Sequence, residues 1–178
     1  MLNQKRKTTG FSLRVDEESL ETLRQESTRL GISVNALMNK ILKDYCQNWR
    51  WAERFGIVYL TRPTLSSIIT CCPDESLRLI AKTSGSTGTK DALRTMGITP
   101  TYDHITMFLE ENVGKFGNWF DYNQFSRGRT KIIHLRHELG RKWSIFIAEQ
   151  VSTIFETILG KTVNTELLNN AATLEITM

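Results

Sequence analysis

Residues 10–48 carry a pattern of apolar and polar positions that changes once, from a period of two to the period of a helix. Phe11, Leu13 and Val15 alternate with polar residues, which predicts a short half-buried strand. Two stretches with helical spacing follow. Their apolar positions are Leu20, Leu23 and Leu30 in the first, and Val34, Leu37, Met38, Ile41, Leu42 and Tyr45 in the second. The pattern therefore predicts a strand, a helix, a turn and a second helix.

The residues at the predicted helix ends support these boundaries. Asp16 stands where the N-cap of the first helix belongs, and Glu17 and Glu18 suit the positive end of that helix. Gly31 directly follows the first helix and is suited to a left-handed C-cap. Ser33 is the expected N-cap of the second helix.

A single strand leaves its backbone N–H and C=O groups without partners. A symmetric dimer solves this problem, because each chain then donates one strand to a two-stranded antiparallel ribbon. The apolar stripe of the second helix is also wider than a unit of about forty residues can bury alone. A ribbon of this kind fits the major groove of B-DNA, where its polar face can reach the base edges.

The segments Phe11–Glu18 and Leu30–Leu42 resemble the ribbon-helix-helix superfamily of Arc, MetJ and CopG-type DNA-binding proteins. The resemblance covers roughly residues 10–48. It implies that three polar-face positions of the strand read the bases: Gly10, Ser12 and Arg14. It also implies that the start of the second helix binds phosphate through Ser33, Val34 and Asn35, whose backbone N–H groups and helix dipole suit an anion.

Two other interpretations of this region stay open at this point. Arg14 can be an ordinary solvated strand arginine, and the whole element can be a dimerisation module without a role in DNA binding. Charge favours the DNA interpretation, because residues 1–50 hold nine Lys/Arg against six Asp/Glu and so carry +3 of the net +4. Lys5, Arg6 and Lys7 just before the strand predict a basic arm that binds phosphates, although a solubilising tail has the same composition.

The rest of the chain predicts a mixture of helices and strands. A strand is expected over 55–61 and a polar loop over 83–88. Five helices are expected. One spans 63–72, one begins at 73, a short one ends near 96, one begins at 101, and a long one spans 141–159. A hairpin is expected over 118–125 and 130–137, and a last strand over 173–177. The fold class is therefore α+β, with a domain over 1–48 and a second domain over 49–178 that oligomerises or senses a ligand. Trp49 and Trp51 are expected at the boundary.

Several motifs in the second domain resemble parts of phosphate-binding or metal-binding sites but lack residues that such sites require. The segment Lys82–Lys90 is locally similar to the phosphate-binding loop of adenylate-forming enzymes, but it lacks the proline before its lysine and the Walker pattern. His134 and His137 are three apart, so they point to opposite faces of a strand, and with His104 they are expected to be structural. The alternative is a metal sensor, because one ribbon-helix-helix family carries a nickel-binding C-terminal domain.

The remaining candidates do not form a catalytic cluster, and no enzyme activity, cofactor or metal is expected. The three cysteines are expected to be reduced and at least partly buried: Cys46, Cys71 and Cys72. Four aromatic residues of the hairpin are expected at an interface between chains rather than against a ligand: Trp119, Phe120, Tyr122 and Phe125.

These observations lead to one principal hypothesis and one alternative. The chain has neither an apolar run long enough for a membrane span nor the apolar core of a signal peptide, so a cytoplasmic location is expected. We expect a sequence-specific transcriptional regulator that binds double-stranded DNA as a homodimer, with a tetramer formed through the C-terminal domain as a further option. A small-molecule or protein effector is left open. The alternative is a DNA-tethered adaptor of the antitoxin or plasmid-partition type.

Overall fold

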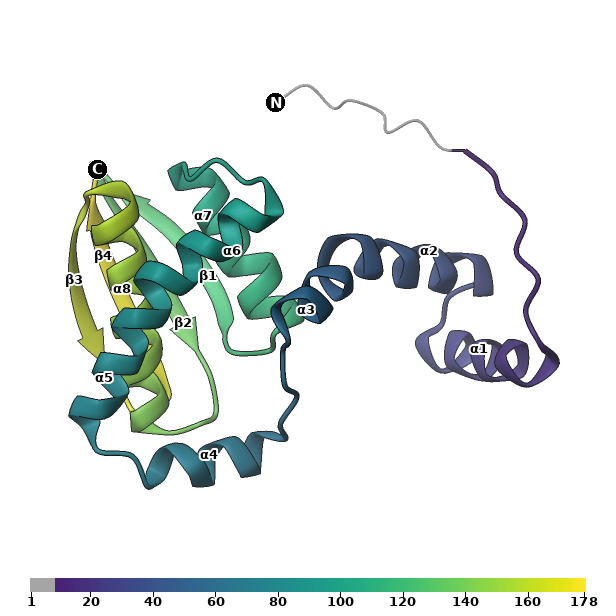
Figure 1. Ribbon diagram of the computed structural model, residues 1–178, viewed down its shortest axis with the longest axis horizontal. Helices are drawn as coiled ribbons and strands as arrows, with labels where there is room; N and C mark the ends of the chain where they lie inside the picture. The colour runs from purple at the N-terminus through teal and green to yellow at the C-terminus, as the bar shows by residue number, and fades with distance from the viewer. Residues whose placement is uncertain (1–8) are drawn as a thin grey trace. The chain divides into compact units, whose positions relative to one another are not determined.

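The computed structural model describes residues 9–178 of the 178-residue chain (Figure 1). The chain divides into two compact units, Met1–Arg50 and Trp51–Met178. Helices predominate in both, and the second unit also contains a four-stranded antiparallel sheet, so the predicted α+β class is confirmed. The predicted arm at Lys5, Arg6 and Lys7 lies outside the described residues.

The N-terminal unit contains the two predicted helices, α1 (Glu17–Leu30) and α2 (Val34–Asp44), followed by the π-helix η1 (Tyr45–Trp49). The expected caps are present. The Asp16 carboxylate accepts a 2.8 Å hydrogen bond from the backbone N–H of Ser19, and Ser33 Oγ accepts a 3.1 Å bond from the N–H of Ala36. Gly31 has φ of 66°, the left-handed conformation that ends a helix at low cost only for glycine.

The strand predicted over Phe11, Leu13 and Val15 is not formed in this single chain. Residues 9–16 have no regular secondary structure and run as an unpaired trace up to α1 (Figure 1). A strand exists only when a neighbour supplies hydrogen-bond partners, and none of the strands in the described residues pairs with this segment. The alternating pattern therefore lacks the partner that would make it a strand.

The C-terminal unit begins with α3 (Arg50–Phe55), whose first residue lies at the boundary, and continues with four helices and two π-helices before the sheet. These are α4 (Arg62–Thr70), α5 (Asp74–Thr83), η2 (Ser84–Gly88), α6 (Thr89–Met96), α7 (Tyr102–Phe108) and η3 (Leu109–Phe116). The predicted helix ends are found: Pro63 lies in the first turn of α4, Gly97 is the C-cap of α6, and Thr101 is the N-cap of α7.

The sheet consists of two hairpins with α8 (Arg141–Leu159) between them in the chain. Its strands are β1 (Asp121–Arg127), β2 (Thr130–Arg136), β3 (Thr162–Leu167) and β4 (Ala171–Thr177), in the spatial order β1-β2-β4-β3. Ile133 of β2 lies opposite Leu174 of β4, and both side chains are fully buried. The helix α8 covers this apolar face of the sheet (Figure 1) and contributes Val151 and Phe155 to the same core.

The predicted strand over 55–61 is wrong, as are some strand boundaries. The chain is helical to Phe55, and residues 57–61 have no regular structure, although Ile57, Val58 and Leu60 favour strands. Propensity alone does not make a strand without a partner. The hairpin and α8 are confirmed, with β1 beginning three residues later than predicted, whereas β3 was not predicted at all.

The polar loop predicted over 83–88 is also wrong, because this segment is the π-helix η2 and joins α5 to α6. Gly85 is buried against α8, and a Cβ there would collide with the carbonyl oxygen of Gln150 and lie 3.0 Å from Cβ of Thr153. Gln150 Nε2 also donates a 2.7 Å hydrogen bond to Ser84 Oγ. The small polar residues that resemble a phosphate loop thus allow two helices to approach closely.

Ion pairs between α5 and α8 support the same helix packing. Glu149 of α8 accepts a 2.6 Å hydrogen bond from Arg78 and lies 3.5 Å from Lys82 Nζ, both on α5. The Glu149 side chain is only 18% exposed, so its two cationic partners compensate a carboxylate that is largely withdrawn from water.

Among the helices of residues 9–178, none combines the length and apolar character needed to cross a membrane.

The close approach at Gly85 gives a testable consequence for stability. Gly85→Ala should destabilise the C-terminal unit by about 1–3 kcal/mol, because the added methyl group meets backbone that cannot move aside easily. Gly88→Ala is the matched control, since its nearest neighbours lie 3.9 Å from an added Cβ, and it should be neutral or stabilising by up to about 1 kcal/mol. Urea denaturation measures both changes, and equal effects of the two substitutions would contradict this packing.

Candidate nucleic-acid interface

The three residues predicted to read bases lie in the segment that precedes α1. Gly10, Ser12 and Arg14 are all exposed to solvent. The segment is joined to α1 at Asp16, where the N–H and hydroxyl of Ser19 bond to the carboxylate and lower the pKa of Asp16 below its ordinary value. The carboxylate therefore stays ionised and caps the start of α1.

The residues predicted to bind phosphate lie at the start of α2. Ser33 is the N-cap, and Val34 and Asn35 form the first turn, whose N–H groups lack carbonyl partners earlier in the helix. The first turn of α2 contains no acidic residue, whereas Glu17 and Glu18 occupy the first turn of α1. The positive end of α1 is thus offset by the chain's own carboxylates, whereas the first turn of α2 has no such carboxylate.

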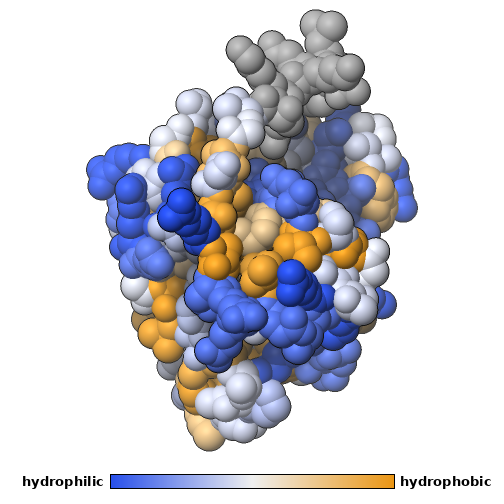
Figure 2. Space-filling view, turned by 90° about the vertical axis from the view of Figure 1, so that its right-hand side faces the viewer, coloured by the Kyte–Doolittle hydropathy of each residue, from blue (hydrophilic) through white to orange (hydrophobic). Residues whose placement is uncertain are grey.

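The N-terminal unit leaves most of its apolar side chains on the surface. Only Ser27 and Leu37 are buried among residues 9–50. Phe11 is 68% exposed and Leu13 57% exposed. The other large exposed apolar residues of this unit are Val15, Leu30, Ile32, Ile41, Leu42, Tyr45 and Trp49. Figure 2 shows apolar side chains lying open between hydrophilic ones on the face it presents.

The three histidines occupy structural positions. Nδ1 of His104 lies 2.7 Å from the carbonyl oxygen of Thr99, and Nδ1 of His134 lies 3.0 Å from Thr173 Oγ1 on the neighbouring strand. His137 is buried and bonds to Ser144. Within residues 9–178, no group of three or more His, Cys, Asp and Glu side chains is arranged to hold a metal ion.

The cysteines and aromatic residues differ in part from expectation. Cys46 and Cys71 are exposed rather than partly buried, and only Cys72 is intermediate. Phe120 belongs to the core, and the ring of Trp119 lies 5.1 Å from that of Trp143. The burial of Phe120 contradicts an interface role for that residue, whereas Trp119 is partly buried against Trp143 and Phe146 of α8. Phe125 is 52% exposed.

One feature of the C-terminal unit was missed by sequence reasoning. A polar cavity of about 350 Å³ is lined by Thr106, Glu110, Tyr122, Asn123 and Gln124, which come from α7, η3 and β1. No local signal identifies such a site, because the helical residues and the strand residues meet only after the chain folds back. The apolar spacing of residues 101–113 indicated only a helix face.

Comparison with protein-family models, with curated proteins and with solved structures finds no match for this chain. The functional argument therefore depends on the residues and their geometry.

His137 is a buried titratable side chain whose two ring nitrogens both have hydrogen-bond partners. Its Nδ1 accepts a 3.1 Å hydrogen bond from the backbone N–H of Leu139, so Nε2 carries the proton and donates to Ser144 Oγ at 2.9 Å. Burial lowers the pKa of His137 from the ordinary value of 6.5 to about 4. Protonation of Nδ1 would also remove the acceptor for Leu139.

A pH dependence of stability follows. The unfolded chain binds a proton at His137 near pH 6.5, whereas the folded chain binds it only near pH 4. The contribution of His137 to stability is therefore complete above pH 6.5 and is lost as the pH falls toward 4. His137→Asn keeps an acceptor for Leu139 but does not titrate, so urea denaturation between about pH 7 and pH 4.5 should show a shallower loss of stability than in the wild type. Identical pH profiles would contradict a neutral, buried His137.

Proposed function

We propose that this chain is a sequence-specific DNA-binding regulator that acts as a homodimer. Residues 10–15 of two chains would pair as an antiparallel ribbon that enters the major groove of double-stranded DNA. The observation that carries the proposal is the exposure of Phe11, Leu13 and Val15, in strand alternation, directly before a helix–glycine–helix element that cannot bury its own apolar side chains. Pairing removes both problems, the missing strand partner and the uncovered apolar face.

The size of the uncovered face supports dimerisation. Burying one large aliphatic or aromatic side chain contributes about 1.5–3 kcal/mol, and nine such side chains are exposed between Phe11 and Trp49. A unit of about forty residues without disulfide bonds or a metal rarely supports a core by itself. A second copy supplies the same apolar face in a symmetric arrangement.

The ribbon would present its polar positions to DNA because side chains alternate between the two faces of a strand. Phe11, Leu13 and Val15 would face the helices of the dimer, and Ser12 and Arg14 would face the bases. Arginine can donate two hydrogen bonds to the O6 and N7 atoms of guanine, and serine pairs with several bases. Gly10, which has open space around it, would let the backbone approach the groove.

The phosphates flanking the site would be bound by groups without sequence preference. The N–H groups at Ser33, Val34 and Asn35 would hold one phosphate per chain at the positive end of α2. Lys5, Arg6 and Lys7 would add charge-dependent affinity from the basic arm. These contacts would position the ribbon, and the base contacts would give specificity.

A second candidate function is a DNA-tethered adaptor that binds another protein through the C-terminal unit. It is favoured by the segment between α3 and α4, where Ile57, Val58 and Leu60 are 48%, 79% and 51% exposed. Consecutive exposed apolar residues are typical of protein contact sites. The DNA-binding part of the proposal is the same in both cases.

Arginine substitutions test base reading. Arg14→Ala should weaken binding to the best duplex selected from a random pool by about 1–3 kcal/mol per half-site and should remove the preference over scrambled DNA. Arg24→Ala is the matched control, since it removes the same charge from an exposed position on α1 that pairs with Glu21. Fluorescence anisotropy measures both variants across a salt series. Equal loss of preference in the two variants, or none in either, would show that Arg14 does not read bases.

Substitutions of exposed apolar residues test the dimer. Phe11→Ser with Leu13→Ser removes side chains that are exposed in the single chain, so a monomeric protein would tolerate the change. In the proposed dimer these side chains are buried, and the dissociation constant should rise at least about a hundredfold. Val58→Ser with Leu60→Ser is the control, because these residues are similarly exposed but lie in the C-terminal unit.

Sedimentation velocity over a concentration series reports the mass of the wild type and both double variants. The proposal requires a wild-type dimer that dissociates only in the Phe11/Leu13 variant. A wild-type monomer, or the same dimer in all three proteins, would contradict a shared ribbon.

A further inference from the structure

The polar cavity between η3 and β1 is open to solvent and has the volume of a site for a small ligand. Its volume is about 350 Å³, at the lower end of the range typical of ligand sites. Every residue that lines it carries a polar side chain: Thr106, Glu110, Tyr122, Asn123 and Gln124. A hydrophilic ligand is therefore expected rather than an apolar one.

Two glycines lie where the chain turns back from η3 toward β1. A Cβ at Gly114 would lie 3.1 Å from the carbonyl oxygen of Phe120, and a Cβ at Gly117 would lie 3.2 Å from Trp119 Cδ1. The chain thus turns back tightly after η3 and brings the start of β1 against the helix that carries Glu110. An eight-residue π-helix such as η3 is rare, and π-helical segments in proteins are frequently associated with functional sites.

The charge around the cavity favours a cationic ligand. Glu110 is the one charged residue that lines it. Lys115 Nζ lies 2.8 Å from Glu110 Oε1 and 2.7 Å from Glu111 Oε1, so one cation is shared between two carboxylates. These hydrogen bonds raise the pKa of Lys115 above its ordinary value and keep it charged, and the three groups together retain one negative charge.

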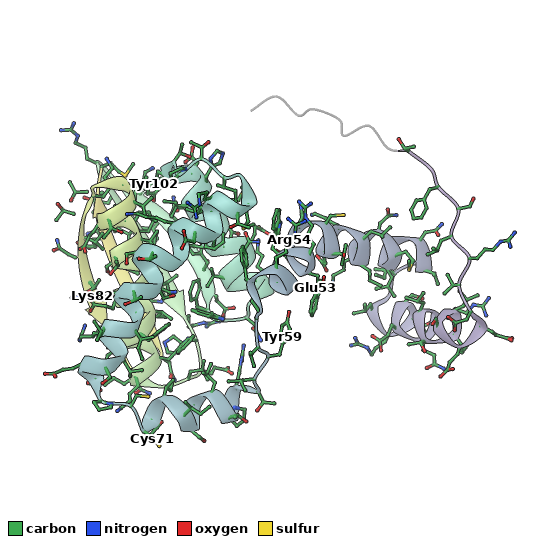
Figure 3. The ribbon with its side chains drawn as sticks, in the orientation of Figure 1. Glu53, Arg54, Tyr59, Cys71, Lys82 and Tyr102 are labelled. Atoms are coloured by element: carbon green, nitrogen blue, oxygen red, sulfur yellow. The ribbon has the colours of Figure 1, made fainter. Side chains whose placement is uncertain are left out.

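The tyrosines beside the cavity supply neutral hydrogen-bonding groups. The hydroxyl of Tyr122 donates a 2.7 Å hydrogen bond to Gln124 Oε1, and burial raises the pKa of Tyr122, so the phenol stays protonated. Tyr102 on α7 (Figure 3) precedes Thr106 by about one helical turn and interacts electrostatically with Tyr122. Its buried hydroxyl has no hydrogen-bond partner in residues 9–178, which is costly unless a ligand or water supplies one.

We propose that this cavity binds a small hydrophilic organic molecule that carries a protonated amino group. The ammonium group lies against the Glu110 carboxylate and supplies the positive charge that Lys115 alone does not. The hydroxyl or amide part of the ligand bonds to the side chains of Tyr122, Asn123 and Gln124. This site belongs to the C-terminal unit, and its occupancy does not depend on DNA binding.

Two compounds that differ only in the amino group test the proposal. The full-length chain is titrated with 4-amino-1-butanol and with 1,4-butanediol, and binding is followed by the amide signals of η3 and β1 in two-dimensional NMR. The amino alcohol should bind saturably with one site, and the diol should bind at least about tenfold more weakly because it lacks the charge.

Two carboxylate variants locate the binding site. Glu110→Gln and Glu111→Gln each remove one partner of Lys115 and one negative charge, but only Glu110 lines the cavity. Glu110→Gln should weaken binding of the amino alcohol at least about tenfold, and Glu111→Gln should change it by less than about threefold. Tyr122→Phe, which removes one polar group without altering charge, should also weaken binding.

The proposal is overturned by any of three results: no saturable binding of the amino alcohol, equal binding of the diol, or equal weakening by the two glutamine variants. The last result would show a general effect of surface charge.

Discussion

The apolar face that residues 9–50 leave uncovered is the physical constraint on which the proposed function depends. The caps at Asp16 and Ser33 and the turn at Gly31 specify two helices, but they do not bury the apolar side chains of those helices. Hydrophobic burial is the largest favourable contribution to folding, so a unit that buries only Ser27 and Leu37 needs another surface. In the proposed dimer, a second copy would provide both that surface and a strand partner for residues 11–15. The same pairing would place Ser12 and Arg14 beside their counterparts in the second chain, as the proposed DNA reading requires.

The C-terminal unit is different, because its sheet and α8 bury a large apolar core within the single chain. Ile133, Leu174 and Phe155 are fully buried, and Glu149 and Gly85 each stabilise the packing of the helix α5–η2 against α8. The polar pocket lined by residues of α7, η3 and β1 is less closely packed than this core. Glu110 and Tyr122 line that pocket, and the buried hydroxyl of Tyr102 has no hydrogen-bond partner among residues 9–178.

The parts of the fold that depend on local chemistry could be predicted from the sequence. Asp16, Gly31, Ser33 and Thr101 act through hydrogen bonds and backbone angles within a few residues, and they lie at the predicted helix ends. The helix α8 was predicted over 141–159 because its apolar spacing and Gly160 are also local signals. The segment around Gly85 was mistaken for a loop because the surface that selects glycine there, on α8, is more than sixty residues away. The strand expected over 55–61 failed for a related reason, since its sequence favours a strand but no neighbour pairs with it.

The candidate sites also differ in whether local sequence signals identify them. The positions of Ser12 and Arg14 follow from alternation and can be named from the sequence, but their pairing is a property of two chains. The cavity at Glu110 needs the fold, because residues of α7, η3 and β1 line it together. A sequence pattern indicates such a site only when its ligands have a recognisable spacing, and this one has none.

The most direct test of the central claim is an isotope-filtered NOE spectrum of an equimolar mixture of labelled and unlabelled chains. The account predicts intermolecular NOEs between backbone protons of residues 11–15, in the cross-strand pattern of an antiparallel pair. Signals from residues 11–15 with no intermolecular NOE, in a protein whose mass is that of one chain, would contradict it.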